Sequence, residues 1–262
     1  MSYETFGLWL AATALSAIRI TCAVRLCPAF SESLLTGMAR HLVILVLTLM
    51  VVPMVKAQWN ALPSGPMWAF LAVKEAVLGT CFGFLAAIPF RVIEVAGNLM
   101  DNQRGATMGE IFSPMSESQA APLAEFLTQC WIALFYLSGA VLLFLTALFE
   151  SYRLFPVVSG IQFTAALPQL ALGSVDALMG LAVIISAPVI IVMVLATLGL
   201  GLVNRSAPQL NVFFLSMPIK SALGILVLIL SLRLMMDRLF GESLGELLQT
   251  LSQWIQTEAS NG

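Results

Sequence analysis

The most regular set of polar side chains follows the third apolar segment of the chain. Four of them are separated by three or four residues: Arg91, Glu94, Asn98 and Asp101. Because residues at this spacing share one face of a helix, they predict a polar stripe, and Asp101 can pair with Arg104 one turn later. Gly105 is suited to end the helix. The stripe is either a solvated helix end, with ion pairs contributing about 0–1 kcal/mol each, or a polar seam against a partner subunit.

A second polar cluster lies between two strongly apolar segments. It consists of Asn204, Arg205, Ser206, Ala207, Pro208, Gln209, Leu210 and Asn211. Pro208 disfavours helical geometry at Ala207, so one interpretation is the turn of a helical hairpin. Because amide side chains in a low-dielectric environment need hydrogen-bond partners, their density also indicates a contact with other protein groups.

Three charged residues are embedded in apolar segments: Lys74 and Glu75 in the third and Lys220 in the sixth. An ionisable side chain at the centre of a membrane costs about 2.5–3.5 kcal/mol or more, so such residues normally mark a polar path or a partner contact. One hypothesis is therefore a small-solute transporter or channel that uses these three residues. Lys74 and Glu75 are adjacent and point about 100° apart on a regular helix, so we expect them to face different partners.

The sequence contains no arrangement typical of a catalytic centre. It has one histidine, His41, and it lacks a phosphate-binding glycine loop, a GxSxG motif and an HExxH motif. The four cysteines lack zinc-like spacing and lie in or beside apolar segments, which is typical of small core residues. The net charge of −2 gives no basic surface for nucleic acid. We therefore expect neither enzymatic activity nor a cofactor, a metal or a nucleic-acid partner.

Composition indicates which elements must position these residues. The chain has 262 residues, of which 60% are hydrophobic and 10% charged, whereas about 25% are charged in a typical soluble domain. Six apolar segments cover residues 6–24, 42–55, 69–90, 131–149, 177–203 and 212–232. Since a bilayer core about 30 Å thick requires roughly 20 helical residues, these segments predict an all-α polytopic membrane protein. The second segment is short enough to be a buried or re-entrant helix rather than a span, whereas the fourth is the cleanest, with no charge from residue 126 to 149.

Prolines interrupt four of the segments. They are Pro53, Pro89, Pro188 and Pro218. Each removes a backbone donor and favours a kink, and broken helices are tolerated in membranes where protein or water surrounds them. The longest uncharged stretch, residues 177–204, contains Pro188 and ends at the second polar cluster, so we interpret it as a bent hairpin arm. Residues 237–256 place apolar side chains at helical spacing and predict an amphipathic C-terminal helix.

Two motifs together resemble the SctT/FliR family of type III secretion export-apparatus proteins. The first is Asp101-Asn102-Gln103-Arg104-Gly105-Ala106-Thr107, and the second is Ala207-Pro208-Gln209-Leu210-Asn211, followed by Lys220-Ser221. The similarity in pattern covers nearly the whole chain, including its length, the order of its segments and its amphipathic tail. The second motif is similar to the part shared by injectisome and flagellar members, and the first is more similar to the injectisome branch.

The resemblance implies a subunit of an export gate in the bacterial inner membrane, through which unfolded secreted proteins pass. In this family one copy joins several copies of two small membrane proteins, SctR and SctS, in a helical cone raised toward the periplasm, alongside SctU-like and SctV-like proteins. The family's segments form bent helical hairpins, which fits the four prolines. The residues implied at subunit interfaces are Asp101, Asn102, Gln103, Arg104, Asn204, Arg205, Pro208, Gln209, Asn211 and Lys220.

The resemblance also implies a loop that helps to plug the closed channel. In this sequence the loop would cover residues 105–122, with adaptable apolar contacts from Met108, Ile111, Phe112 and Met115. On this basis we divide the single membrane domain into N-terminal helical segments (1–100), the polar motif and plug loop (101–125), helical hairpins (126–236) and the amphipathic C-terminal helix and tail (237–262).

Overall fold

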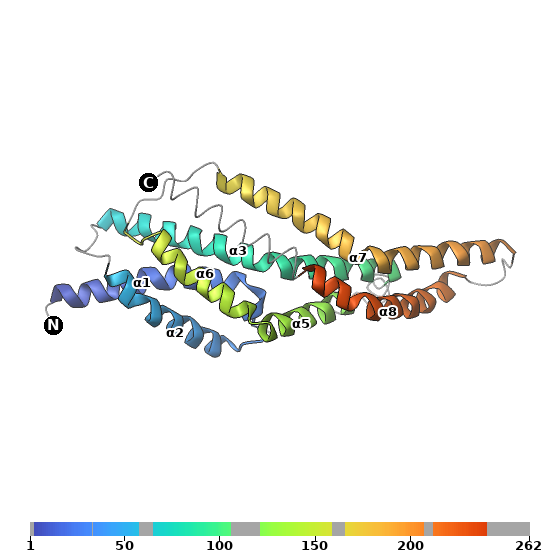
Figure 1. Cartoon of the computed structure of the whole chain (residues 1–262), viewed down its shortest axis with the longest axis horizontal. Coiled ribbons are helices and arrows are strands. Elements are labelled where there is room, and N and C mark those ends of the chain that lie inside the picture. Colours follow the sequence, from blue (N-terminus) through green and yellow to red (C-terminus); the bar gives the residue numbers. More distant parts are fainter. Residues whose placement is uncertain are drawn as a thin grey trace. The chain divides into compact units, whose positions relative to one another are not determined.

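The computed structural model of the chain describes residues 3–32, 34–57, 65–105, 121–158, 166–206 and 212–239. Within these ranges the regular secondary structure is helical and no strand is present (Figure 1). The elements are α1 (Tyr3–Leu26), η1 (Pro28–Phe30), α2 (Gly37–Lys56), α3 (Gly65–Arg104), α5 (Pro122–Leu137), α6 (Ala140–Leu154), α7 (Ala166–Ser206) and α8 (Val212–Leu239). Five of the described helices are long and apolar enough to cross a membrane, which confirms the prediction of an all-α polytopic membrane protein.

Two helices are much longer than a bilayer requires. α3 has 40 residues and α7 has 41. At 1.5 Å per residue each is about 60 Å long, twice the thickness of a bilayer core of about 30 Å. The apolar segments predicted at 69–90 and 177–203 are therefore parts of longer helices. α3 continues through the polar stripe to Arg104, and Gly105, with a φ of +89°, ends it as predicted.

Two of the predicted segments differ from the structure. The second is not a short re-entrant piece, because α2 begins at Gly37 and its 20 residues are enough to span a membrane. The fourth segment is uncharged from residue 126 to 149, yet it does not form one straight helix. It is broken between α5 and α6, which are bent by 69°. Gly139 lies at the break with a φ of +76°, a conformation that L side chains rarely adopt, so Ser138-Gly139 was the sequence signal for it.

The four prolines singled out in the sequence all lie inside helices. Pro53 is in α2, Pro89 in α3, Pro188 in α7 and Pro218 in α8. Figure 1 shows α7 changing direction between its yellow first half and its orange second half, and Pro188 lies near the middle of this helix. A proline ring that clashes with the preceding turn is a sufficient cause of such a bend.

The chain divides into two compact units, and the described residues of the first belong to Met1–Ala87 and Leu134–Leu170. In this unit α1 packs against α2 and against the first half of α3. At Gly79 and Gly83, α3 approaches α1 so closely that an added Cβ atom would collide with the backbone of Arg19 and of Ala23, respectively. These glycines bring α3 into direct backbone contact with α1.

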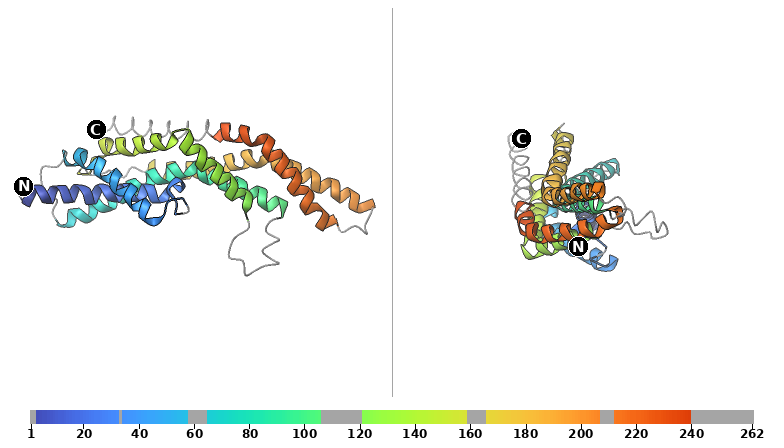
Figure 2. Two further views of the ribbon diagram at one scale, coloured as in Figure 1. Left: turned by 90° about the horizontal axis from the view of Figure 1, so that it is seen from below. Right: turned by 90° about the vertical axis from the view of Figure 1, so that its right-hand side faces the viewer.

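The second unit contains Ile88–Ala133 and Ala171–Thr250. The second half of α3 and the first part of α5 form an antiparallel pair, because Gly97 lies against Ala124 while Phe90 lies against Trp131 with ring centroids 6.3 Å apart. α8 packs against α7 (Figure 2), and the close approach is again at a glycine, where a Cβ added to Gly224 would collide with the Met193 side chain.

We predict that Gly79→Ala lowers the free energy of unfolding by about 1–3 kcal/mol, because an overpacked contact forces backbone shifts. The measurement is the thermal midpoint of the purified protein in mild detergent. The matched control is Gly180→Ala in α7, where a Cβ atom meets nothing within 4 Å and alanine favours the helix. An equal midpoint for the two variants would contradict the close packing of α1 against α3.

Candidate functional site

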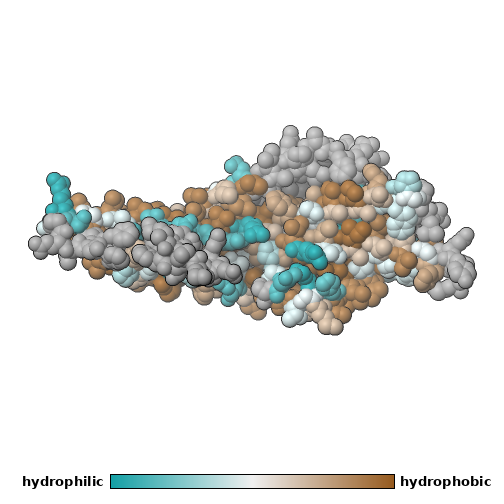
Figure 3. Space-filling model, turned by 180° about the vertical axis from the view of Figure 1, so that it is seen from behind, coloured by the Kyte–Doolittle hydropathy of each residue, from teal (hydrophilic) through white to brown (hydrophobic). Residues whose placement is uncertain are grey.

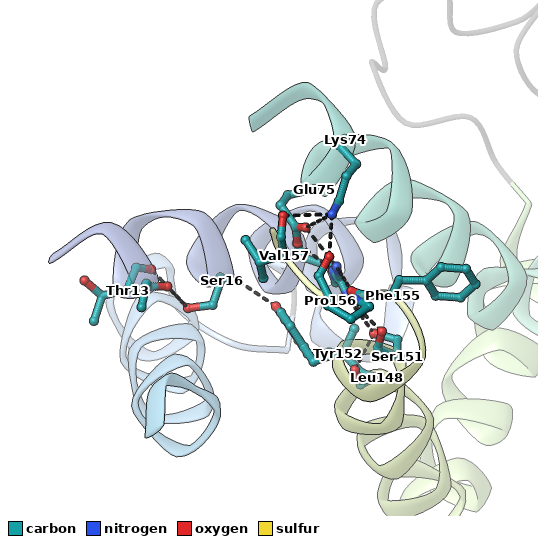
Figure 4. A network of polar contacts seen from close by, with 12 residues as sticks. Thr13, Ser16, Lys74, Glu75, Leu148, Ser151, Tyr152, Phe155, Pro156 and Val157 are labelled. Atoms are coloured by element: carbon teal, nitrogen blue, oxygen red, sulfur yellow. Dashed lines mark hydrogen bonds and ion pairs between the residues drawn. The ribbon is translucent and has the colours of Figure 1, made fainter. Parts of the chain in front are cut away.

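A buried cluster of charged residues lies in the first unit, where α1, α3 and the end of α6 meet (Figure 4). Its charged members are Arg19, Lys74 and Glu75, and no more than 1% of any of them is exposed. Burial of an isolated charge in a low-dielectric interior is very costly, so every charge in such a cluster needs a partner of opposite charge or polarity.

Arg19 and Glu75 form the central ion pair of the cluster. The guanidinium Nε lies 2.7 Å from Glu75 Oε2 and Nη2 lies 2.9 Å from Oε1, so the pair is bidentate. Nη1 donates to the Ser151 carbonyl at 2.9 Å and to its hydroxyl at 3.1 Å, and Nη2 donates to the Phe155 carbonyl at 3.0 Å. These five contacts match the five N–H donors of a guanidinium group.

Lys74 contacts the same cluster from the neighbouring position on α3. Its ammonium lies 3.6 Å from Glu75 Oε1 and donates to the carbonyls of Pro156 at 2.6 Å and Val157 at 2.9 Å. The main partners of the two residues differ, as expected from their positions on the helix. The Glu75 carboxylate pairs with Arg19 of α1, whereas the Lys74 ammonium donates to carbonyls just beyond the end of α6.

The cluster contains two cations and one carboxylate, and backbone carbonyls supply the remaining negative partial charge. They belong to Ser151 and to residues 155–157, at or just beyond the end of α6 at Leu154. The last carbonyls of a helix lack intrahelical partners and carry partial negative charge, so cations are favourable there. The Tyr152 ring lies 4.1 Å from Arg19 Cζ, and its hydroxyl donates to the Ser16 carbonyl at 2.7 Å.

The cluster does not favour the solute-path hypothesis. Lys74 and Glu75 are fully buried and their partners come from the protein, while Lys220 is a half-buried residue of α8. Arg19, the central cation, was missed by the sequence analysis. The available signal was its position as the only charged residue of the first apolar segment, 6–24.

A second arrangement of charges lies in the second unit, at the end of α3. The predicted ion pair is confirmed, because Arg104 Nη2 lies 2.8 Å from Asp101 Oδ1. The other oxygen, Oδ2, accepts hydrogen bonds from the backbone N–H groups of Leu123 at 2.9 Å and Ala124 at 3.1 Å. Asp101 is only 2% exposed, and no signal in the sequence pattern linked it to the start of α5.

The polar stripe on α3 therefore divides into two parts. Arg91 and Glu94 pair at 2.6 Å with more than 40% of each side chain exposed, as expected of a solvated helix end. Asp101 contacts another helix of the same chain, so a polar seam against a partner subunit stays a prediction.

The other predicted site residues lie in different surroundings. Asn102, Asn204 and Arg205 are exposed, and Gln103 is half-buried. Pro208, Gln209, Asn211, the plug contacts Met108, Ile111, Phe112 and Met115, and the C-terminal segment from residue 240 lie outside the described residues. The assignment of all these residues to subunit interfaces or to a plug stays a prediction.

No group of three or more His, Cys, Asp or Glu residues that could hold a metal ion occurs in the part of the chain that the structure describes. All four cysteines are free. Burial raises the pKa of Cys27, just beyond α1, to about 11, so this residue is a neutral thiol at physiological pH.

Comparison with known proteins gives a consistent set of relatives. Residues 10–244 match the family described as bacterial export proteins, family 1. The secretion system apparatus protein SsaT of Salmonella typhimurium is 38% identical over 226 residues, which are 85% of this chain and 87% of the relative. The Yop proteins translocation protein T of Yersinia pestis is 40% identical over 214 residues, or 80% of this chain and 81% of the relative. The flagellar biosynthetic protein FliR of Pectobacterium carotovorum is 27% identical over 241 residues, or 90% and 91%.

We predict that Glu75→Gln lowers the free energy of unfolding by about 3–5 kcal/mol, because it leaves two buried cations without their carboxylate. Glu94→Gln, on the same helix, removes an exposed ion pair and should cost about 0–1 kcal/mol. Thermal midpoints in detergent and the amount of protein in the membrane measure both effects. Equal losses in the two variants would show that the buried cluster does not stabilise the first unit.

Proposed function

This chain belongs to the family of bacterial export proteins, family 1, and from that premise we propose that it is an export-apparatus subunit of a type III protein secretion system. The observation that carries the proposal is the extent of the similarity. A protein named as a secretion system apparatus protein is 38% identical to this chain over 85% of its length. The chain is also more similar to the two secretion and translocation proteins than to the flagellar one, which supports the injectisome branch.

In this role the protein forms part of a gated channel through which unfolded secreted proteins pass, and it does no chemistry of its own. Helices α3 and α7 support this function, since at about 60 Å each they exceed a bilayer core of about 30 Å. Helices of that length suit an assembly that extends beyond the membrane. We place this assembly in the inner membrane, raised toward the periplasm.

The surface of the chain supports assembly with other membrane proteins. Large apolar side chains remain exposed along α2, α7 and α8, as with Met50 at 63%, Leu198 at 61% and Leu230 at 76%, and Figure 3 shows apolar residues over much of one face. In a membrane such a surface contacts lipid or other subunits. The partners that we propose are SctR-like and SctS-like gate subunits, with SctU-like and SctV-like proteins of the export apparatus.

The polar motif and plug loop (101–125) are proposed to hold the channel shut when no substrate passes. The apolar contacts proposed for this role are Met108, Ile111, Phe112 and Met115. Residues 1–100 and 126–236 would form the helical wall, and residues 237–262 would form the C-terminal amphipathic helix and tail.

We predict that deletion of residues 108–118 raises the leakage of potassium ions through the assembled complex, because the proposed plug is lost. The measurement is potassium efflux from proteoliposomes that contain the complex, compared with the same complex carrying the intact chain. Secretion of substrates by cells with the same deletion is the second readout. Wild-type leakage together with wild-type secretion would overturn the assignment of the plug.

A further inference from the structure

The start of α5 has an unusual helix cap. The first N–H groups of a helix have no intrahelical acceptor and are normally satisfied by the side chain of the residue before the helix. That residue here is Ala121, whose carbonyl accepts from the N–H of Glu125 at 3.1 Å. Its methyl side chain accepts nothing. Pro122 follows at the first helical position and has no N–H to satisfy.

Asp101 supplies the missing cap from another helix. Its Oδ2 accepts from the N–H groups of Leu123 and Ala124, which are the second and third positions of α5. A carboxylate at a helix N-terminus also interacts favourably with the helix dipole. Arg104 lies 2.8 Å from the other oxygen, so both oxygens of the carboxylate are held.

The packing around the cap is close and well defined. One turn before Asp101, Gly97 lies so near Ala124 that an added Cβ atom would collide with the Ala124 backbone. Two turns further along the pair, Phe90 and Trp131 meet edge to face at an interplanar angle of 76°. The Asp101 contacts therefore complete an antiparallel α3–α5 pair at the point where the chain leaves α3 and where α5 begins.

We propose that Asp101 is a positioning residue of the export channel, which holds the start of α5 against the end of α3. Its role goes beyond capping α5, because a local cap at residue 121 would satisfy the same N–H groups without joining the two helices. The inference rests on the proposed function, because it states that the channel closes fully only when Asp101 joins α3 to α5.

The experiment compares three variants that separate the cap from the join. Asp101→Ala removes both. Ala121→Asp adds a local cap, because an aspartate before the helix accepts from its third N–H. The double variant Asp101→Ala/Ala121→Asp keeps a cap on α5 but lacks the join to α3. Glu94→Ala, which removes an exposed carboxylate two turns earlier on α3, is the matched control.

Two readouts are taken on the assembled complex. Hydrogen exchange of the amides of Leu123 and Ala124 reports on the cap, and potassium leakage from proteoliposomes reports on the closed state. We expect Asp101→Ala to speed exchange by about tenfold, the equivalent of one lost cap, and to raise leakage with an unchanged amount of complex. The double variant should restore slow exchange while leakage stays high. Glu94→Ala should change neither readout.

Three results would overturn the inference. Unchanged exchange in Asp101→Ala would show that the cap does not form. Restoration of both exchange and leakage in the double variant would reduce Asp101 to a local helix cap. Normal leakage in Asp101→Ala, while deletion of residues 108–118 leaks, would remove the positioning role and leave the proposed plug standing. If neither Asp101→Ala nor the deletion of residues 108–118 raises leakage, both the positioning role and the proposed plug are overturned.

Discussion

The first unit depends on the neutralisation of two buried cations. Arg19 and Lys74 lie in apolar helices, where an unpartnered charge costs about 3–5 kcal/mol, a large share of the roughly 5–15 kcal/mol by which a native fold is stable. A single carboxylate, Glu75, contacts both cations. Carbonyl groups at and just beyond the end of α6 supply the remaining negative partial charge. The last carbonyls of a helix lack intrahelical donors and lie at the negative end of the helix dipole, so a cation is favourable there. The cluster therefore both neutralises the buried charges and provides hydrogen-bond donors for the carbonyls at the end of α6. The close packing of α1 against α3 at Gly79 lies beside this ion pair.

The same principle operates with the opposite sign in the second unit. There the open end is the N-terminus of α5, and the partner is the carboxylate of Asp101. Helix α3 supplies the ionisable groups in both cases, Lys74 and Glu75 near its beginning and Asp101 near its end. These charged residues of α3 contact helix ends and form ion pairs within the chain, whereas the exposed surface of α2, α7 and α8 is largely apolar. A division of this kind suits a subunit whose outer surface is covered by lipid and by other membrane proteins.

Much of the fold could be predicted from the sequence, because the bilayer imposes length and composition on each helix. The apolar runs, the helical polar stripe, its end at Gly105 and the Asp101–Arg104 pair followed from spacing alone. The break at Ser138-Gly139 was missed since an uncharged apolar run does not by itself indicate where it bends. The role of Arg19 and the contact of Asp101 with α5 were also missed. Both join residues more than 20 positions apart, and local periodicity carries no information on such pairs.

The central claim is that this chain works as one subunit of a mixed export channel and not as a transporter on its own. Native mass spectrometry of the complex isolated through this chain in mild detergent tests the claim most directly. The account predicts one copy of this chain bound to several copies of two smaller membrane proteins. A chain that is isolated alone, or only with further copies of itself, while it conducts solute in liposomes would contradict it.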